Sequence, residues 1–354
     1  MQPEENPDVE IGRFLTEVAR FPGIPPFMGE ISVSSPGSEK TTVAMLQSLV
    51  PNDGDGWQWF LNELAQWLAG QSGDARHTAA QGVNLQAERV EILEDLTGAK
   101  ATLDAAVLLG RRTAEMHLAL SSAGDLPAFA SEPMTAKDLE RDAQRIEEQI
   151  KSTLDALKLK LPSLSDGACD AAGLLIARRP ELLKRARTVV DVGETGQRIR
   201  IHGDFHLGQT LRTRATWANK SGDFVVIDFE GEPARSIEER RRKQSPLKDV
   251  AGMMRSFSYA AYTAANQVLA GNENEKDRER LTGWAQCWQD AASAEFLWAY
   301  GETAARNGDL LPDPAAAQVL LEAYLLEKAL YEVLYELNHR PEWLRIPISG
   351  ILQL

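Results

Sequence analysis

Two aspartates, each in a loop that follows an alternating apolar segment, mark the part of this chain best equipped for chemistry. Residues 198–201 and 224–227 have the period and the β-branched content of strands that bury one face. The first segment runs into a loop that carries Asp204, and the second runs into a loop that carries Asp228. Residues 198–233 are therefore predicted to form a hairpin that presents two carboxylates.

The two loops are predicted to meet. A strand over 210–214 followed by a polar turn would fold Asp228 back beside Asp204 and Gln209. The turn contains Asn219, Ser221 and Gly222. Phosphoryl transfer needs such a set, because a carboxylate must orient the attacking hydroxyl and hard oxygen ligands must hold Mg²⁺ against the phosphates. In this hypothesis Asp204 is the base, and Gln209 and Asp228 are the metal ligands.

A transition-metal site is the competing interpretation of the first loop. His202, Asp204 and His206 have the i, i+2, i+4 spacing of ligands in some metal-dependent hydrolases. That interpretation leaves Gln209 and the second loop without a function, so we favour the phosphoryl-transfer hypothesis. We then expect His202 to be a buried hydrogen-bonding residue that braces the loop, and His206 to form a wall of the site.

Two motifs extend this pattern to a known family. HGDFHLGQTLRT, from His202, and VIDFEGEP, from Val226, resemble the catalytic and metal loops of maltokinases, which are protein-kinase-like small-molecule kinases found alone or fused to trehalose synthase. The resemblance runs from Asn6 to Ile351. It implies ATP-dependent phosphorylation of maltose to maltose 1-phosphate for α-glucan synthesis, with ATP and Mg²⁺ as cofactors and trehalose synthase as a fused or associated partner.

The resemblance also implies a nucleotide site. Glu10 lies on a helix predicted to begin after Asn6, and in the family such a glutamate pairs with the lysine that grips the α- and β-phosphates. The alternative for Glu10 is a first-turn acid that complements the helix dipole. Residues 46–51 resemble the hinge whose backbone would bind adenine, which makes Gln47 and Leu49 nucleotide-binding candidates.

Other roles are implied farther along the chain. Glu230 would contact the metal or the acceptor, and Asp249 would reach back to brace the catalytic loop. The last helix, predicted over 314–338, carries a stripe at helical spacing: Tyr324, Lys328, Tyr331, Glu332 and Tyr335. Aromatic and charged groups on one face suit a sugar, and the resemblance implies acceptor binding by Lys328, Tyr331 and Tyr335. Packing at the rim of the core is the alternative for these tyrosines.

The expected fold class is α+β, with a protein-kinase-like (aminoglycoside phosphotransferase-like) fold. Residues 1–50 would form a reduced N-lobe of helix, hairpin and hinge, and residues 51–354 a large, mainly helical C-lobe that contains the 198–233 hairpin. The N-lobe strands are predicted over 28–34 and 42–49, around a turn at 35–38. Helices are predicted over 57–71, 99–120, 135–157, 166–187 and 250–269.

The family's phosphate-covering hairpin and strand lysine are expected before Glu10, yet nine residues precede it and the first lysine is Lys40. We therefore expect a chain that lacks the first part of the N-lobe, either as a fragment or through loss, with impaired activity by itself. An exposed strand edge would then favour a homodimer. The alternatives are a non-catalytic interaction or glucan-binding module of a fused enzyme, and a related small-molecule kinase with another acceptor.

Composition limits the partners and the cellular compartment expected for this chain. The chain has 354 residues, a net charge of −14 and a pI near 5.0, which disfavours nucleic acid and anionic membranes as partners. Cys169 and Cys287 are too few for a disulfide framework and fit a reducing cytoplasm. No apolar run approaches the ~20 residues of a membrane helix.

Overall fold

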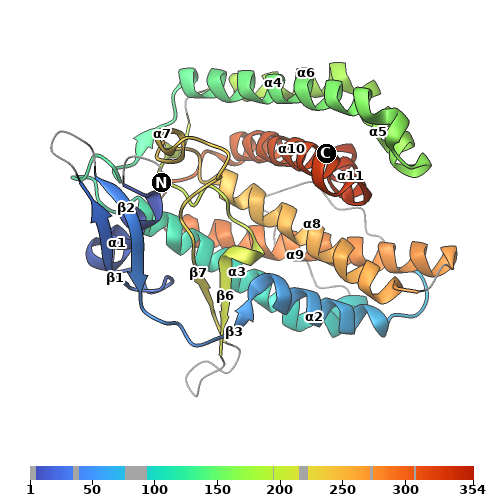
Figure 1. Ribbon diagram of the computed structural model, residues 1–354, viewed down its shortest axis with the longest axis horizontal. Coiled ribbons are helices and arrows are strands. Elements are labelled where there is room, and N and C mark those ends of the chain that lie inside the picture. Colours follow the sequence, from blue (N-terminus) through green and yellow to red (C-terminus); the bar gives the residue numbers. More distant parts are fainter. Residues whose placement is uncertain are drawn as a thin grey trace. The chain divides into compact units, whose positions relative to one another are not determined.

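The computed structural model describes residues 5–34, 40–75, 94–193, 195–214, 222–271, 274–306 and 308–354. The predicted turn at 35–38 and the turn residues Asn219 and Ser221 lie outside this range. The chain divides into two compact units (Figure 1). The first unit comprises Met1–Glu132 and Gln197–Leu311, and the second comprises Pro133–Gly196 and Pro312–Leu354. This division differs from the predicted lobe boundary near residue 50, which stays a prediction.

The first unit holds both loops of interest. Its elements are α1 (Pro7–Arg13), η1 (Phe14–Val18), β1 (Phe27–Val33), β2 (Thr41–Gln47), β3 (Asn52–Asp55), α2 (Gly56–Ala69), η2 (Glu94–Ala99), α3 (Lys100–Leu120), η5 (Leu207–Gln209), β6 (Thr210–Thr213), β7 (Phe224–Val226), α7 (Ile237–Arg240), α8 (Leu247–Leu269) and α9 (Glu275–Ala304). The short strands β4 (Glu132–Pro133) and β5 (Gln197–Arg198) lie where the chain passes between the units.

The second unit is helical. Its elements are α4 (Ala136–Lys160), η3 (Leu161–Ser163), α5 (Asp166–Ala177), α6 (Arg179–Thr188), η4 (Val189–Val192), α10 (Pro314–His339), η6 (Pro341–Trp343) and α11 (Arg345–Gln353). The single helix predicted over 166–187 is divided at Arg178. Pro180 explains the break, because proline has no N–H to continue a helix but is well placed at its first turn.

The predicted N-terminal hairpin is confirmed as the antiparallel pair β1–β2, with Ile31 opposite Ala44. It forms a two-stranded sheet of its own, and many of its apolar side chains are exposed. These are Met28, Ile31, Val33, Val43 and Leu46. An apolar, two-stranded hairpin is the kind of surface that natural proteins usually cover.

A second sheet, in the order β3-β6-β7, carries the chemistry-bearing loops. Thr210 pairs with Val226, which confirms the strands predicted over 210–214 and 224–227. The strand predicted over 198–201 is wrong beyond Arg198. Ile199 instead exchanges two backbone hydrogen bonds with Gln244, at 3.0 and 2.8 Å, in an isolated bridge. Farther along, the backbone N–H groups of His202 and Gly203 bind a side chain, as described below.

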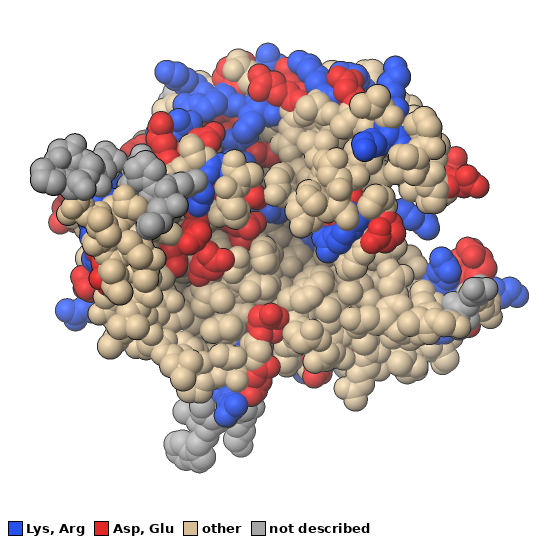
Figure 2. Space-filling view, viewed as in Figure 1, with Lys and Arg blue, Asp and Glu red and all other residues tan. Residues whose placement is uncertain are grey.

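The core of the first unit lies among α2, α3, α8 and α9. The largest buried side chains there are aromatic: Phe60, Phe257, Trp288, Phe296 and Tyr300. The long helix α9 was not among the helices expected from the sequence. In the described part of the chain, no helix is both long enough and apolar enough to cross a bilayer. On the face shown in Figure 2, the described basic and acidic side chains are interspersed.

We expect Gly252→Ala to lower the free energy of unfolding by about 1–3 kcal/mol. Gly252 lies on α8, and a Cβ atom there would come within 2.6 Å of the carbonyl oxygen of Phe205, in the loop after the first apolar segment. Urea denaturation measures the change. Gly283→Ala on α9 is the matched control, because its Cβ would lie 3.7 Å from Ala75, and it should gain about 0.5–1 kcal/mol. Equal losses in the two variants would contradict the close contact.

Candidate functional site

The loop that carries Asp204 is held by one buried carboxylate. Asp249 on α8 accepts hydrogen bonds from the backbone N–H groups of His202 (2.8 Å) and Gly203 (2.9 Å). Burial would raise the pKa of Asp249, but the interactions with His117 and His202 and the hydrogen bond from the Gly203 N–H outweigh burial and lower it. Asp249 therefore makes the contacts with the catalytic loop that were expected of it. Its importance for catalysis stays a prediction.

His117 and Tyr300 support this carboxylate, which the sequence did not indicate. His117 on α3 is fully buried, with Nε2 3.1 Å from Asp249 Oδ2 and Nδ1 3.0 Å from the Tyr300 hydroxyl. The simplest assignment has Nε2–H donating to the carboxylate and Nδ1 accepting from Tyr300. A histidine within an apolar helical pattern gave no sign of a partner 132 residues away.

The side chain of His202 joins the two loops. Its Nε2 lies 2.9 Å from the carbonyl oxygen of Ile227, and its Nδ1 accepts from the Asp204 N–H at 3.4 Å. The ring lies against Phe205 and Phe229, with centroids 5.2 and 4.9 Å away. Because both ring nitrogens are engaged, the transition-metal interpretation of this loop is wrong. No three His, Cys, Asp or Glu side chains among the described residues could hold a metal ion.

Asp204 and His206 lie at the open side of the loop. Their side chains are 21% and 39% exposed, and His206 Nε2 is 4.0 Å from Asp204 Oδ2. His206 also caps the start of η5, where its Nδ1 accepts from the Gly208 N–H at 3.1 Å. This arrangement leaves the Asp204 carboxylate within reach of solvent, as a base that must meet a substrate requires.

Asp228 and Gln209 come together at the ends of β7 and β6. Gln209 Nε2 donates to Asp228 Oδ2 at 2.7 Å, and the Ile227 N–H donates to the Gln209 carbonyl at 3.0 Å. Asp228 is exposed and has a φ of 65°, in the left-handed region that non-glycine residues rarely adopt. Such strain often occurs at functional sites.

These two residues fit a magnesium ion. Mg²⁺ prefers hard oxygen ligands, keeps several waters, and is usually bound by one or two carboxylates plus substrate phosphates. The exposed Asp228 carboxylate and the amide oxygen of the adjacent Gln209 are donors of that kind. Asp204 belongs to the same locality, because His202 contacts Ile227, the residue before Asp228.

The start of α1 contacts the second loop directly, which the sequence did not reveal. Asn6 caps α1 by accepting from the Asp8 N–H, and its amide donates to Glu230 Oε1 at 2.9 Å. Asp8 accepts from the Phe229 N–H at 2.8 Å. Burial raises the pKa of Asp8 to about 6, with the charges of Asp228 and Glu230 adding to the effect.

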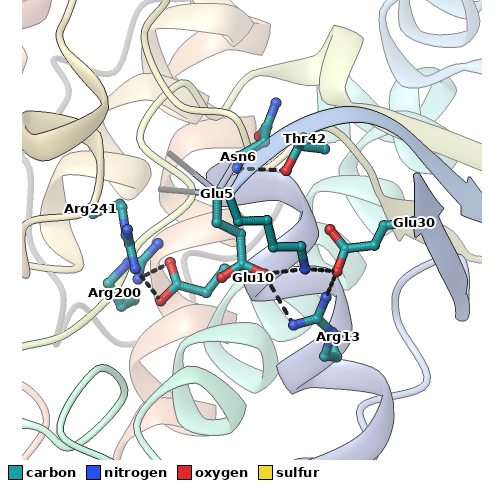
Figure 3. Close-up of polar contacts among 9 residues, drawn as sticks. Glu5, Asn6, Glu10, Arg13, Glu30, Thr42, Arg200 and Arg241 are labelled. Atoms are coloured by element: carbon teal, nitrogen blue, oxygen red, sulfur yellow. Dashed lines mark hydrogen bonds and ion pairs between the residues drawn. The ribbon is translucent and has the colours of Figure 1, made fainter. Parts of the chain in front are cut away.

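Glu10, also on α1, is bound by two arginines (Figure 3). Its Oε2 is 2.8 Å from Arg200 and its Oε1 is 3.0 Å from Arg241. Burial would raise the pKa of Glu10, but the two guanidinium groups outweigh it and lower the pKa. Both carboxylate oxygens of Glu10 therefore face arginine, where the family has a lysine. A role of Glu10 in nucleotide binding stays a prediction.

The predicted hinge residues lie at the end of β2. Gln47 pairs with Phe27, and the next N–H, of Ser48, donates to the Pro26 carbonyl at 2.9 Å. Leu49 is 91% exposed. An exposed apolar side chain after a strand is compatible with a surface that covers a base, and adenine binding stays a prediction for both Gln47 and Leu49.

The predicted acceptor residues belong to the second unit, on α10. Lys328 Nζ lies 5.2 Å from the Tyr331 ring centroid, and Tyr335 is 43% exposed and stacks on His339 at 4.5 Å. Tyr324 does not share their exposure. It is buried and donates to Asp142 at 2.8 Å, because the α10 face that it occupies packs on α4. The stripe is therefore shorter than expected.

Known proteins resemble this chain in sequence. No family model matches the chain. A glucosamine kinase of Streptacidiphilus jiangxiensis is 27% identical over 324 residues, which are 90% of this chain and 59% of that protein. A glucosamine kinase of Mycolicibacterium smegmatis is 26% identical over 332 residues, 94% of this chain and 67% of that protein. The chain thus spans about three fifths of the length of the first relative.

Solved structures of glucosamine kinases resemble this chain in fold. A glucosamine kinase in complex with glucosamine, ADP and inorganic phosphate has a TM-score of 0.71 at 23% identity, over 99% of this chain and 68% of that one. Glucosamine kinase in a crystal form named B has a TM-score of 0.72 at 23% identity, over 99% of this chain and 70% of that one. The fold is protein-kinase-like. The expected fold class is confirmed, whereas the relatives named above are glucosamine kinases.

We expect Asp249→Asn to lower the free energy of unfolding at pH 7 by about 1.5–3 kcal/mol, because an amide N–H₂ would face a backbone donor. The folded pKa of Asp249 lies below its ordinary value of 3.8. Its stabilisation is therefore complete above that value and is lost as the pH falls through the lower folded pKa. Below about pH 4, urea denaturation should show a steeper loss in the parent chain than in the variant. Asp104→Asn, an exposed site on α3, is the control and should change neither quantity.

Proposed function

We propose that this chain is the catalytic part of an ATP-dependent sugar kinase whose acceptor is glucosamine or a similarly small amino sugar. The observation that carries the proposal is the pairing of Gln209 with Asp228 beside the braced loop that holds Asp204. The glucosamine kinases found by sequence and by fold support the same reaction class.

In the proposed reaction, Asp204 orients a sugar hydroxyl and accepts its proton. The hydroxyl oxygen forms a bond to the γ-phosphorus of ATP, the bond from that phosphorus to the bridging oxygen breaks, and ADP leaves. His206 flanks the carboxylate and forms a wall of the acceptor side. The 2.8–2.9 Å bonds from the loop amides to Asp249 hold Asp204 in place before the sugar arrives.

Gln209 and Asp228 would hold Mg²⁺. When bound, the ion neutralises charge on the phosphates. Glu230 is a further contact candidate for the metal or the acceptor, and its bond from Asn6 fixes the orientation of its carboxylate. These assignments rest on donor chemistry and on the strand ends that bring the groups together.

The proposed acceptor differs from the one expected from the sequence, which was maltose. A net charge of −14 attracts a cationic amino sugar and is indifferent to neutral maltose. The relatives are glucosamine kinases, so maltose becomes a comparison substrate in the test. Trehalose synthase as a partner, a homodimer through the exposed hairpin, and impaired activity of this chain alone stay predictions of the sequence.

We expect Asp204→Asn to lower kcat by about 10²–10⁴-fold, because the general base is lost while the fold and the metal ligands remain. A coupled ADP-release assay with Mg²⁺, ATP and either glucosamine or maltose measures the change. Asp104→Asn should leave the rate unchanged. Turnover of maltose faster than glucosamine would refute the proposed acceptor, and full activity in Asp204→Asn would refute the assigned base.

We further expect Tyr331→Ala and Tyr335→Ala to weaken glucosamine binding about three- to tenfold, through lost ring contact with the sugar. Calorimetry on the folded variants measures the affinity. Leu159→Ala is the control, since Leu159 is an 80% exposed apolar residue of the same unit. Unchanged affinity in both tyrosine variants would assign these side chains to packing and surface contacts.

A further inference from the structure

Helix α1 and its cap contact three separate segments around the proposed active site. Asn6 binds Glu230, and Asp8 binds the Phe229 N–H. One turn farther on, Glu10 binds both Arg200 and Arg241. Glu10 is the member of this series that joins two other segments to each other, since each of its carboxylate oxygens takes a different arginine (Figure 3).

Arg200 connects Glu10 to the catalytic loop. It lies two residues before His202, is 2% exposed, and stands over the ring of Phe129 with its Cζ 5.5 Å from the centroid. In the described structure its Nη1 donates to Glu10, while its Nε and Nη2 have no partner. Burial lowers the pKa of Arg200 and the Glu10 charge opposes that change. Glu10 is thus the anion that compensates a buried cation beside the loop.

Arg241 connects the same carboxylate to the segment after the second loop. It directly follows α7, and its side chain is 35% exposed. Its neighbour Arg240 donates to backbone carbonyls of the intervening turn, those of Glu230 (3.5 Å), Pro233 (3.4 Å) and Arg235 (2.9 Å). A fixed Arg241 therefore holds α7, and α7 holds the chain that leaves Phe229 and Glu230.

We propose that Glu10 is a positioning residue for phosphoryl transfer, which rests on the proposed function. Its two oxygens couple the end of α7 to the segment that leads into the Asp204 loop, so that the loops of Asp204 and Asp228 keep one relative arrangement. A single carboxylate shared by two arginines does this because moving either segment leaves a charge uncompensated. On the same helix, Arg13 pairs with Glu30 of the β1–β2 hairpin, so that pair serves the hairpin and not the loops.

The test compares Arg241→Ala with Arg242→Ala. Arg242 is the adjacent arginine, 51% exposed and paired with Glu238 on its own helical turn. In Arg241→Ala we expect faster amide hydrogen exchange across residues 229–241 and a kcat lowered about tenfold or more, with KM for ATP and sugar within about twofold. Arg241→Lys should recover part of kcat. Arg242→Ala should match the parent in exchange and in rate.

Glu10→Gln is the second variant. If it folds by circular dichroism, the double variant Glu10→Gln/Arg241→Ala should lose little more kcat than Glu10→Gln alone, because the two groups act as one unit. If it does not fold, Arg241→Ala decides. Equal exchange in the Arg241 and Arg242 variants overturns the positioning role whatever the activity. A parent chain that phosphorylates no sugar refutes the proposed function. In that case, the hydrogen exchange of the Arg241 and Arg242 variants still decides whether Glu10 couples the end of α7 to the segment before the Asp204 loop.

Discussion

The buried carboxylate of Asp249 is the constraint on which the site depends. It lies on a helix in the core, and it takes the two backbone N–H groups at the start of the Asp204 loop. A buried charge without partners would cost several kcal/mol, so the helix and the loop are stable only together. His117 and Tyr300 extend the chain of hydrogen bonds into the core. The loop is thereby held by the core of the first unit.

The two loops meet because one side chain serves both. His202 donates to the carbonyl of Ile227 and packs between two phenylalanines, one from each loop. Helix α1 then adds polar contacts from outside, through Asp8 and Glu10. The β6–β7 ladder sets the register that places Gln209 beside Asp228. Positioning of this kind is what phosphoryl transfer requires, since the reaction depends more on orientation and charge than on covalent chemistry with the protein.

The fold does not identify the acceptor of the proposed reaction. A protein-kinase-like fold hosts many acceptors, so the fold by itself names none. The proposal of an amino sugar rests on the relatives and on the acidic charge of the chain. The residues suggested for sugar binding, Tyr331 and Tyr335, belong to the second unit, whereas the proposed base and metal ligands belong to the first.

The kinase-like fold class came from the resemblance of the two loop motifs. The sequence by itself predicted most helices, the β1–β2 hairpin, the strands β6 and β7, and the meeting of Gln209 with Asp228, whose roles stay predictions. These are local patterns, in which the period of apolar residues and the spacing of polar residues along one segment carry the information. Only the tertiary structure decided the partners of Glu10, the support of Asp249 by His117, and the burial of one tyrosine of the α10 stripe. Those depend on contacts between residues from about 130 to 230 positions apart, such as Glu10 with Arg241. A linear pattern cannot specify them, because the same carboxylate or imidazole suits several partners until packing brings one within reach.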